Sequence, residues 1–287
     1  MRTIKNLIFE GGGVLGMAYV GALVQLDQKN VLKNVERVAG TSAGALIAML
    51  VSLRYETEKL KEIVNNTNFR SFEDHLNPLR VVTKYGVYRG DCLLEFIQKL
   101  ICDVTGDENT TFEALASAGY RDLKVFACDL NTISIQEFSL ETTPKAIVAE
   151  CVRASMSIPL FFRAWKFPNE IPNDHIFVDG GTIYNYPINA FDNYENTLGF
   201  FFKHLEKDPI TNLDFNHPVK YTEALFKALL KAQKVNFYKN QEEVDITVFI
   251  DPLNISPTEF KLTDDQKQLL YNSGLEATKA YLDNLTS

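Results

Sequence analysis

The chain has 287 residues, of which 46% are hydrophobic and 23% are charged, as is typical of a soluble globular protein. Its formal net charge is −8, and no run of lysine or arginine forms a basic stripe, so nucleic acid is not an expected partner. The same acidity argues against strong electrostatic attachment to anionic lipid, although a local patch of cations would still permit it.

The N-terminus lacks the apolar segment of a signal peptide, and no stretch reaches the roughly 20 apolar residues that a spanning helix needs. The cysteines show no C-x-x-C spacing, which indicates reduced thiols rather than disulfides or a metal site. They are Cys92, Cys102, Cys128 and Cys151. We therefore expect a cytoplasmic protein, at most peripheral at membranes, without metal or other cofactor. Export by a route that does not require an N-terminal signal is an alternative.

Two strand–turn–helix units open the chain. A short apolar strand at residues 7–9 ends at a glycine triplet, and a segment of helical length with several small residues follows at 14–26. A second strand at 35–39 breaks at the turn 40–44, which leads into an entirely apolar helix at 45–51. This alternation is typical of a parallel sheet covered by helices.

The rest of the chain continues the alternation of strands and helices. A helix is expected to begin with Thr143 as N-cap and Pro144 at its first position, and to run to about Arg153. Thr263 and Gln266 form a capping box that opens a helix towards Leu282. Further strands are predicted at 123–128, 133–138, 176–178, 197–202 and 246–250.

Domain boundaries are not evident. The stretch from 205 to 218 is rich in proline, asparagine and aspartate and is predicted to be irregular. No repeat or low-complexity tract interrupts the chain. We expect one domain over residues 1–287, with the motif-bearing blocks in 7–187 and C-terminal helices and a strand in 218–285.

Ser42 lies in a turn, Gly-Thr-Ser-Ala-Gly, that fits the pattern G-x-S-x-G. Such a match arises by chance in about one of ten chains of this length. Here, however, it lies between a predicted strand and a buried helix, where a nucleophile elbow must lie. The sharp turn leaves no room for side chains at Gly40 and Gly44. The alternative is a tight turn in which Ser42 only caps the helix.

A serine nucleophile needs donors for the oxyanion, and the glycine triplet offers them. Gly11, Gly12 and Gly13 end the first strand, and exposed N–H groups at a helix N-terminus bind anions. Gly16 extends the stretch to G-x-G-x-x-G, which also suggests a dinucleotide site. That site needs an acid at the end of the second strand, whereas Glu36 lies at its start, so the dinucleotide interpretation is disfavoured.

Asp179 is the candidate base. It follows the short strand at 176–178 and precedes Gly180 and Gly181, which allow close backbone approach. An unperturbed aspartate, with a pKa near 3.9, is a poor base, but burial beside a hydroxyl would raise that pKa. The alternative is an ordinary Asp-Gly turn. The histidines lack any turn signature that marks a catalyst; they are His75, His175, His204 and His217.

Together, these blocks resemble the patatin-like phospholipase family. Matches occur in order at residues 11–16, at the Ser42 turn, at 154–159 (Ala-Ser-Met-Ser-Ile-Pro) and at Asp179, from which D-G-G-x-x-x-N-x-P continues through Asn185. The resemblance covers residues 7–187 and, more loosely, the C-terminal helix. It implies a three-layer α/β/α sandwich with a mostly parallel central sheet.

The resemblance also implies the chemistry. Ser42 would be the nucleophile and Asp179 the base of a Ser–Asp dyad, and the N–H groups of the glycine triplet, chiefly those of Gly12 and Gly13, would hold the oxyanion. The implied activity is cleavage of lipid or phospholipid esters at a membrane surface, of phospholipase A or lysophospholipase type, through an acyl-serine intermediate. Leu15 stands where the family often has Arg or Lys, which removes a positive charge but no backbone donor.

Two other functions stay open. One is an α/β-hydrolase with a Ser–Asp–His triad that uses His204 or His217, although the elbow comes early for that fold. The other is a catalytically inactive lipid-binding or interaction module. The aromatic residues after the third block are candidates to line an acyl pocket or touch membrane, although such clusters are more often core. They are Phe161, Phe162, Trp165 and Phe167. The lipid headgroup, the acyl position and any activating partner are not specified by the sequence.

Overall fold

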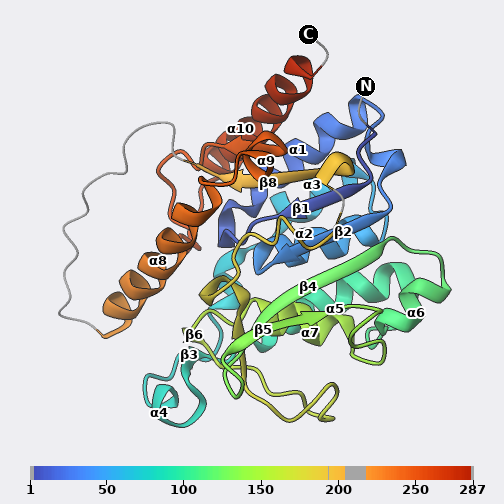
Figure 1. Ribbon diagram of the computed structural model, residues 1–287. Helices are drawn as coiled ribbons and strands as arrows, with labels where there is room; N and C mark the ends of the chain where they lie inside the picture. The colour runs from blue at the N-terminus through green and yellow to red at the C-terminus, as the bar shows by residue number, and fades with distance from the viewer. Residues whose placement is uncertain (1–2, 193, 204–217, 286–287) are drawn as a thin grey trace.

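A computed structural model describes residues 3–192, 194–203 and 218–285. Within them, a seven-stranded sheet has the order β5-β4-β2-β1-β8-β9, and β7 also pairs with β4 (Figure 1). Neighbours from β4 to β9 are parallel, whereas β5 and β7 run antiparallel to β4. The predicted α/β fold with a mostly parallel central sheet is therefore confirmed. The strands are β1 (Asn6–Phe9), β2 (Arg37–Thr41), β4 (Asp122–Asp129), β5 (Ser134–Phe138), β7 (Phe177–Asp179), β8 (Thr197–Phe202) and β9 (Thr247–Ile250).

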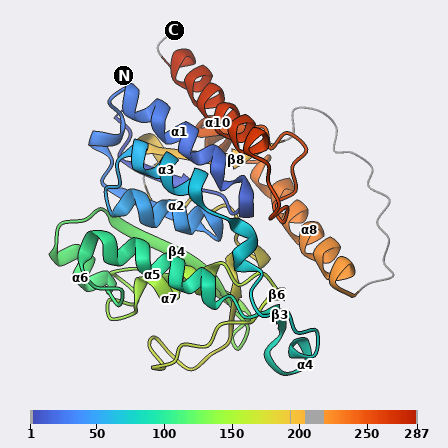
Figure 2. The ribbon, with the colours of Figure 1, turned by 180° about the vertical axis from the view of Figure 1, so that it is seen from behind.

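Helices cover one face of this sheet, as Figure 2 shows for α1, α2, α3 and α5. The α-helices are α1 (Met17–Gln28), α2 (Ala43–Ser52), α3 (Thr57–Asn66), α4 (Arg80–Lys84), α5 (Asp91–Thr105), α6 (Phe112–Ser117), α7 (Val148–Ser155), α8 (Pro218–Phe237), α9 (Gln241–Asp245) and α10 (Asp264–Asn284). Short 3-10 helices are η1 (Gly13–Gly16), η2 (Leu32–Asn34), η3 (Phe69–Phe72), η4 (Gly180–Thr182) and η5 (Tyr194–Asn196). A separate two-stranded sheet joins β3 (Gly86–Tyr88) to β6 (Leu160–Phe162).

Alternation along the strands divides the core between the two faces of the sheet. Leu7 and Phe9 of β1 belong to the large cluster under the helices, whereas Ile8 between them faces the other side. There it meets Ile188 and Phe191 from the chain after β7. Strand β1 is thus buried on both faces, which explains the apolar run from Leu7 to Phe9.

No helix begins at Thr143, so that prediction is wrong. The helix in this part of the chain is α7, which begins at Val148. The Thr143 hydroxyl accepts a hydrogen bond from Ser139 N at 3.1 Å, and the Pro144 carbonyl accepts one from Glu113 N at 2.9 Å. These hydrogen bonds to residues outside the predicted helix hold 143–147 in turns. Ile147 becomes the N-cap residue in place of Thr143.

The predicted capping box is confirmed at the start of α10. The Thr263 hydroxyl accepts from Gln266 N at 3.2 Å, and Gln266 Oε1 accepts from Thr263 N at 2.9 Å. The stretch from 205 to 218 that was predicted to be irregular lies outside the described residues, apart from Pro218, where α8 begins.

Helices α1 and α10 cross at two glycines. A Cβ atom on Gly274 would lie 1.8 Å from the Ala18 carbonyl oxygen, and one on Gly21 would lie 1.9 Å from that of Tyr271. We expect Gly274→Ala to lower the free energy of unfolding by about 1–3 kcal/mol, because α10 must move away from α1. Urea denaturation measures this change. Glu276→Ala, at an exposed position of α10, should change it by less than about 0.5 kcal/mol; equal effects would contradict the close crossing.

Candidate active site

Ser42 occupies the sharp turn between β2 and α2. Its backbone has φ 54° and ψ −125°, a left-handed conformation that a non-glycine residue adopts only under strain. The Ser42 N–H donates to Ser155 Oγ at 2.8 Å, which holds the turn against α7. A Cβ atom on Gly40 would lie 2.2 Å from the Gly44 carbonyl oxygen, and one on Gly44 would lie 2.3 Å from the Phe9 carbonyl oxygen, so both flanking positions are closed to side chains. This is the geometry of a nucleophile elbow.

Asp179 meets Ser42 directly. Ser42 Oγ donates to Asp179 Oδ2 at 2.6 Å, although the two residues are 137 positions apart in the chain. The other carboxylate oxygen, Oδ1, accepts from Gly181 N at 2.7 Å. The Asp179 N–H donates to the Ser157 carbonyl at 2.9 Å, which fixes the end of β7. Ser42 is 7% exposed and Asp179 only 1%, so the pair is shielded from water.

Burial changes the acidity of this aspartate. It raises the pKa of Asp179 from 3.8 to about 7, against the opposing effects of the hydrogen bonds from Ser42 and Gly181 and of the positive charge of Arg153. A carboxylate with a pKa near neutrality is a much stronger base than an ordinary one and is still substantially ionised at pH 7. Asp179 can therefore accept the Ser42 proton.

The same pKa predicts how stability depends on pH. Between about pH 4 and about pH 7 the folded chain keeps a proton on Asp179 that the unfolded chain releases. Stability due to this group is therefore complete below pH 4 and falls as pH rises, by up to about 1.4 kcal/mol per unit. Asp179→Asn removes this dependence. We expect the variant to become progressively more stable relative to wild type from pH 5 to pH 7 in urea unfolding; a constant difference would contradict the raised pKa.

The glycine triplet contributes two free donors rather than three. The Gly11 N–H donates to the Asn185 carbonyl at 3.0 Å, so this predicted oxyanion donor already has an acceptor in the structure. In the part of the chain that the structure describes, the N–H groups of Gly12 and Gly13 donate to no protein acceptor. Gly13 has φ +53°, and a Cβ atom there would lie 2.0 Å from the Pro257 carbonyl oxygen. Only glycine fits this position.

Two cavities adjoin Ser42. One, of about 120 Å³, is lined by the glycine triplet, Ser42, Asp179, Phe161 and residues of α8 that include Phe226 and Leu230. The other, of about 60 Å³, also reaches Ser42 and is lined by Phe162 together with apolar side chains of α2, α3 and the segment after α7. Candidate acyl-binding residues Phe161 and Phe162 thus lie at cavities, one in each.

Trp165 and Phe167 line neither cavity. Both are almost fully buried, and their rings pack edge to face with centroids 6.2 Å apart. The structure therefore places Trp165 and Phe167 in the core, away from the two cavities at Ser42.

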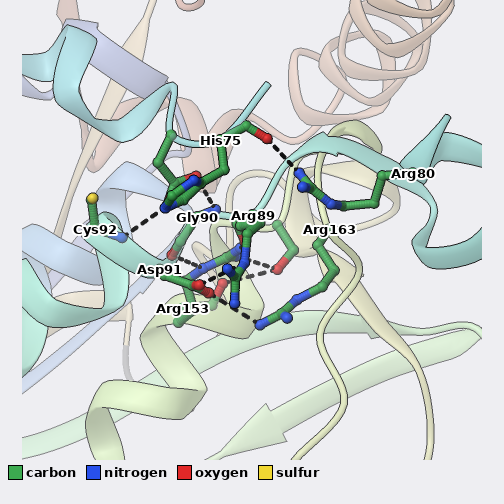
Figure 3. Close-up of polar contacts among 10 residues, drawn as sticks. His75, Arg80, Arg89, Gly90, Asp91, Cys92, Arg153 and Arg163 are labelled. Carbon is green, nitrogen blue, oxygen red and sulfur yellow. Dashed lines mark hydrogen bonds and ion pairs between the residues drawn. The ribbon is translucent and has the colours of Figure 1, made fainter. Parts of the chain in front are cut away.

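Arg153 is a buried residue that the sequence interpretation missed. Its guanidinium donates from Nε to the Gly90 carbonyl at 2.9 Å and from Nη2 to the Arg89 carbonyl at 3.0 Å (Figure 3). Nη1 donates to Ser157 Oγ at 2.7 Å. Complete burial lowers the pKa of Arg153 to about 9. Because Ser157 also accepts the Asp179 N–H, the guanidinium supports the strand end that carries the carboxylate.

A second missed group connects α8 to the site. Gln233 accepts from Asn185 N at 2.8 Å and donates to the Gly181 carbonyl at 2.8 Å, so it bridges the turn that follows Asp179. Asn185 Nδ2 in turn donates at 2.9 Å to the buried Glu10. Burial raises the pKa of the Glu10 carboxyl, and the positive charge of Lys234, 3.6 Å away, opposes this shift. Helix α8 thus supports the turn after Asp179 directly and the glycine triplet through Asn185.

The described histidines lie elsewhere. His175 Nδ1 is 2.7 Å from Asp129 Oδ2, and His75 is exposed. His204 and His217, the candidates for a triad, lie outside the described residues. The four cysteines are free thiols.

Residues 7–192 match the family model for patatin-like phospholipase. The chain therefore belongs to the patatin-like phospholipase family, whose members are in general serine lipid acyl hydrolases. The family match confirms the resemblance that was inferred from the sequence motifs.

The chain is also similar to several individual proteins. An uncharacterized protein (R571) of Acanthamoeba polyphaga mimivirus is 27% identical over 98% of this chain and 95% of its own length. A probable lipid hydrolase, 463L, of Invertebrate iridescent virus 6 is 24% identical over 68% of this chain and 66% of its own. Among solved structures, VipD from Legionella pneumophila has a TM-score of 0.75 at 16% identity, covering 98% of this chain and 67% of VipD. The likeness to VipD concerns the fold.

Proposed function

We propose that this protein is a serine acyl hydrolase that cleaves fatty-acyl esters of lipids, of phospholipase A or lysophospholipase type, at a membrane surface in the cytoplasm. The observation that carries the proposal is the 2.6 Å hydrogen bond from Ser42 Oγ to Asp179 Oδ2. The serine is strained, buried and adjacent to apolar cavities. Because the carboxylate contacts the hydroxyl without an intervening imidazole, the geometry favours a dyad over a Ser–Asp–His triad.

The first half of the reaction is acylation. Ser42 Oγ attacks the ester carbonyl carbon while Asp179 Oδ2 accepts its proton, and the carbonyl oxygen becomes an oxyanion. The free N–H groups of Gly12 and Gly13 are the donors available to it. When the tetrahedral intermediate collapses, the proton passes from Asp179 to the departing alcohol oxygen, and the lysolipid or alcohol leaves.

Deacylation repeats these steps with water. Asp179 removes a proton from a water molecule as its oxygen attacks the acyl-serine carbonyl, and the same donors hold the second oxyanion. Collapse breaks the bond to Ser42 Oγ, which regains the proton from Asp179. The fatty acid is then released. Its chain would lie in the apolar cavities, against Phe161 or Phe162.

Incubation with a mixed lipid extract tests the proposal. Wild type is expected to release free fatty acid, measured by mass spectrometry, whereas Ser42→Ala and Asp179→Asn release none above background. The lipid species that disappear identify the headgroup and the acyl position. Equal release by all three proteins would refute the dyad, and an absence of release by wild type would favour an inactive lipid-binding module.

A double variant, His204→Ala with His217→Ala, separates the dyad from the triad. The dyad predicts that this variant retains its esterase activity. Loss of activity, with an unchanged melting temperature, would instead support a histidine base.

A further inference from the structure

The exposed apolar side chains around α4 are concentrated in one short segment. Four of them, at a spacing of three residues, have exposures from 51% to 81%: Leu76, Leu79, Val82 and Tyr85. Large apolar side chains scattered singly over a surface are ordinary, but a cluster of this kind marks an interaction site. In Figures 1 and 2, α4 lies at the edge of the molecule, beyond β3 and β6.

The same segment has a charge opposite to that of the whole protein. Residues 75–89 contain three cations, Arg80, Lys84 and Arg89, and no aspartate or glutamate, whereas the chain has a net charge of −8. Just beyond it, the single Asp91 carboxylate is shared between Arg89 at 2.8 Å and Arg163 at 3.3 Å (Figure 3). Glu73 and the buried Asp74 precede the segment, so the excess of positive charge belongs to residues 75–89 themselves.

Hydrogen bonds hold the segment in place. Arg80 Nη1 donates to the carbonyls of His75 and Val87, at 2.8 and 2.9 Å, and closes the loop that carries α4. The buried Asp74 accepts from Gly90 N at 2.6 Å and from Cys92 N at 3.0 Å at its base. The apolar side chains are thus presented outward on a fixed backbone.

This segment is continuous with the wall of the Ser42 cavity. Strand β3, which follows α4, pairs with β6, so that Gly86 lies opposite Leu160. The Lys84 carbonyl accepts from Ala164 N at 3.3 Å, just past β6. Leu160 and Phe161 of β6 line the 120 Å³ cavity. Whatever binds the α4 segment therefore lies next to one wall of this cavity.

We propose that residues 75–89, the docking segment, insert their apolar side chains into the surface of a bilayer that contains anionic lipid, and so bring the Ser42 cavity to the membrane. The inference rests on the proposed function, because an acyl ester must leave a bilayer to reach Ser42. Apolar side chains flanked by lysine and arginine are the pattern that binds the interface of anionic membranes.

Vesicle binding tests the docking segment without catalysis. Ser42→Ala protein is mixed with vesicles of phosphatidylcholine and phosphatidylserine at a ratio of about 7:3, and the bound fraction is measured by flotation. Adding Leu79→Glu and Val82→Glu should weaken binding at least about tenfold, since it removes apolar contact and introduces repulsive charge. Vesicles of phosphatidylcholine alone should bind the parent protein more weakly.

A matched control carries the same change in charge elsewhere. Val104→Glu with Leu285→Glu alters exposed apolar side chains at the ends of α5 and α10, and the end of α10 lies at the opposite end of the molecule from α4 (Figure 1). Its vesicle binding should equal that of the parent. Equal binding by the α4 variant and the parent, or equal losses in both double variants, would overturn the proposal.

Two further measurements distinguish membrane docking from a failure of the proposed hydrolase activity and from binding of a second copy of the chain. In the background with Ser42 intact, Leu79→Glu with Val82→Glu should leave hydrolysis of p-nitrophenyl butyrate unchanged while hydrolysis of vesicle lipid falls at least about tenfold. If wild type cleaves neither ester, the proposed function fails, whereas vesicle binding by Ser42→Ala still decides the docking segment. If Ser42→Ala protein does not bind vesicles but forms a dimer, and Leu79→Glu with Val82→Glu abolishes that dimer, then the segment binds a second copy of the chain. The membrane proposal would then be wrong.

Discussion

Asp179→Asn is expected to slow the acylation of Ser42 by at least about a thousandfold. Asparagine keeps the size of the side chain and an oxygen that accepts from Gly181 N, but it cannot take up the Ser42 proton. The loss should appear in kcat/KM for p-nitrophenyl butyrate at pH 8, where the wild-type carboxylate, with a pKa of about 7, is mostly ionised. Below that pH, wild-type activity should decline with the ionised fraction of Asp179.

Asp129→Asn is the matched control for this variant. Asp129 is also a buried carboxylate at a strand end, but it contacts His175 instead of Ser42. Its replacement should change kcat/KM by no more than about threefold. A comparable loss in both variants, or an Asp179→Asn enzyme within about tenfold of wild type, would show that Asp179 is not the base.

Gly13→Ala is expected to lower kcat/KM by about a hundredfold to a thousandfold, the usual effect of disrupting an oxyanion hole. The new Cβ would lie 2.0 Å from the Pro257 carbonyl oxygen on a residue with φ +53°, so the turn has to change shape and its free N–H groups move. The melting temperature should be measured on the same samples, so that a loss of folded protein is not mistaken for a loss of catalysis.

Gly16→Ala is the matched control within the same stretch. A Cβ atom there would meet only the Cβ of Ala43, at the ordinary distance of 3.5 Å. The variant should keep kcat/KM within about threefold of wild type. Near-normal hydrolysis by Gly13→Ala would mean that this turn does not stabilise the oxyanion.

Ser42 and Asp179 could be predicted from the sequence because each is set by its immediate neighbours. Gly40 and Gly44 allow the sharp turn at the end of a strand, and Gly180 and Gly181 allow a close approach after another. The meeting of the two side chains was not set locally, because Asp179 ends β7, which runs antiparallel to β4, whereas the Ser42 turn follows β2, which is parallel to β4.

Contacts between distant segments could not be predicted in this way. Gly11 belongs to the same glycine turn as Gly12, but the Asn185 carbonyl occupies its N–H. Thr143 and Pro144 form a good helix start locally, yet the Pro144 carbonyl accepts a hydrogen bond from the distant Glu113 N instead of one within a helix. In each case a partner remote in sequence changed the outcome of a correct local preference.

The supporting groups were missed for a related reason. Arg153 looks like an ordinary basic residue near the end of a helix, and only tertiary structure shows that three oxygen acceptors surround it. Gln233 lies in a helix of unremarkable composition, 52 positions from the Gly181 carbonyl that it contacts. Neither residue carries a sequence pattern that would distinguish it from a solvated side chain.

Labelling with an alkyl fluorophosphonate, followed by peptide mass spectrometry, tests the Ser42–Asp179 dyad most directly. The dyad predicts a single adduct on the peptide that contains Ser42, no adduct in Ser42→Ala, and labelling at least about a thousandfold slower in Asp179→Asn. An adduct on another residue, or labelling of Asp179→Asn at the wild-type rate, would contradict it.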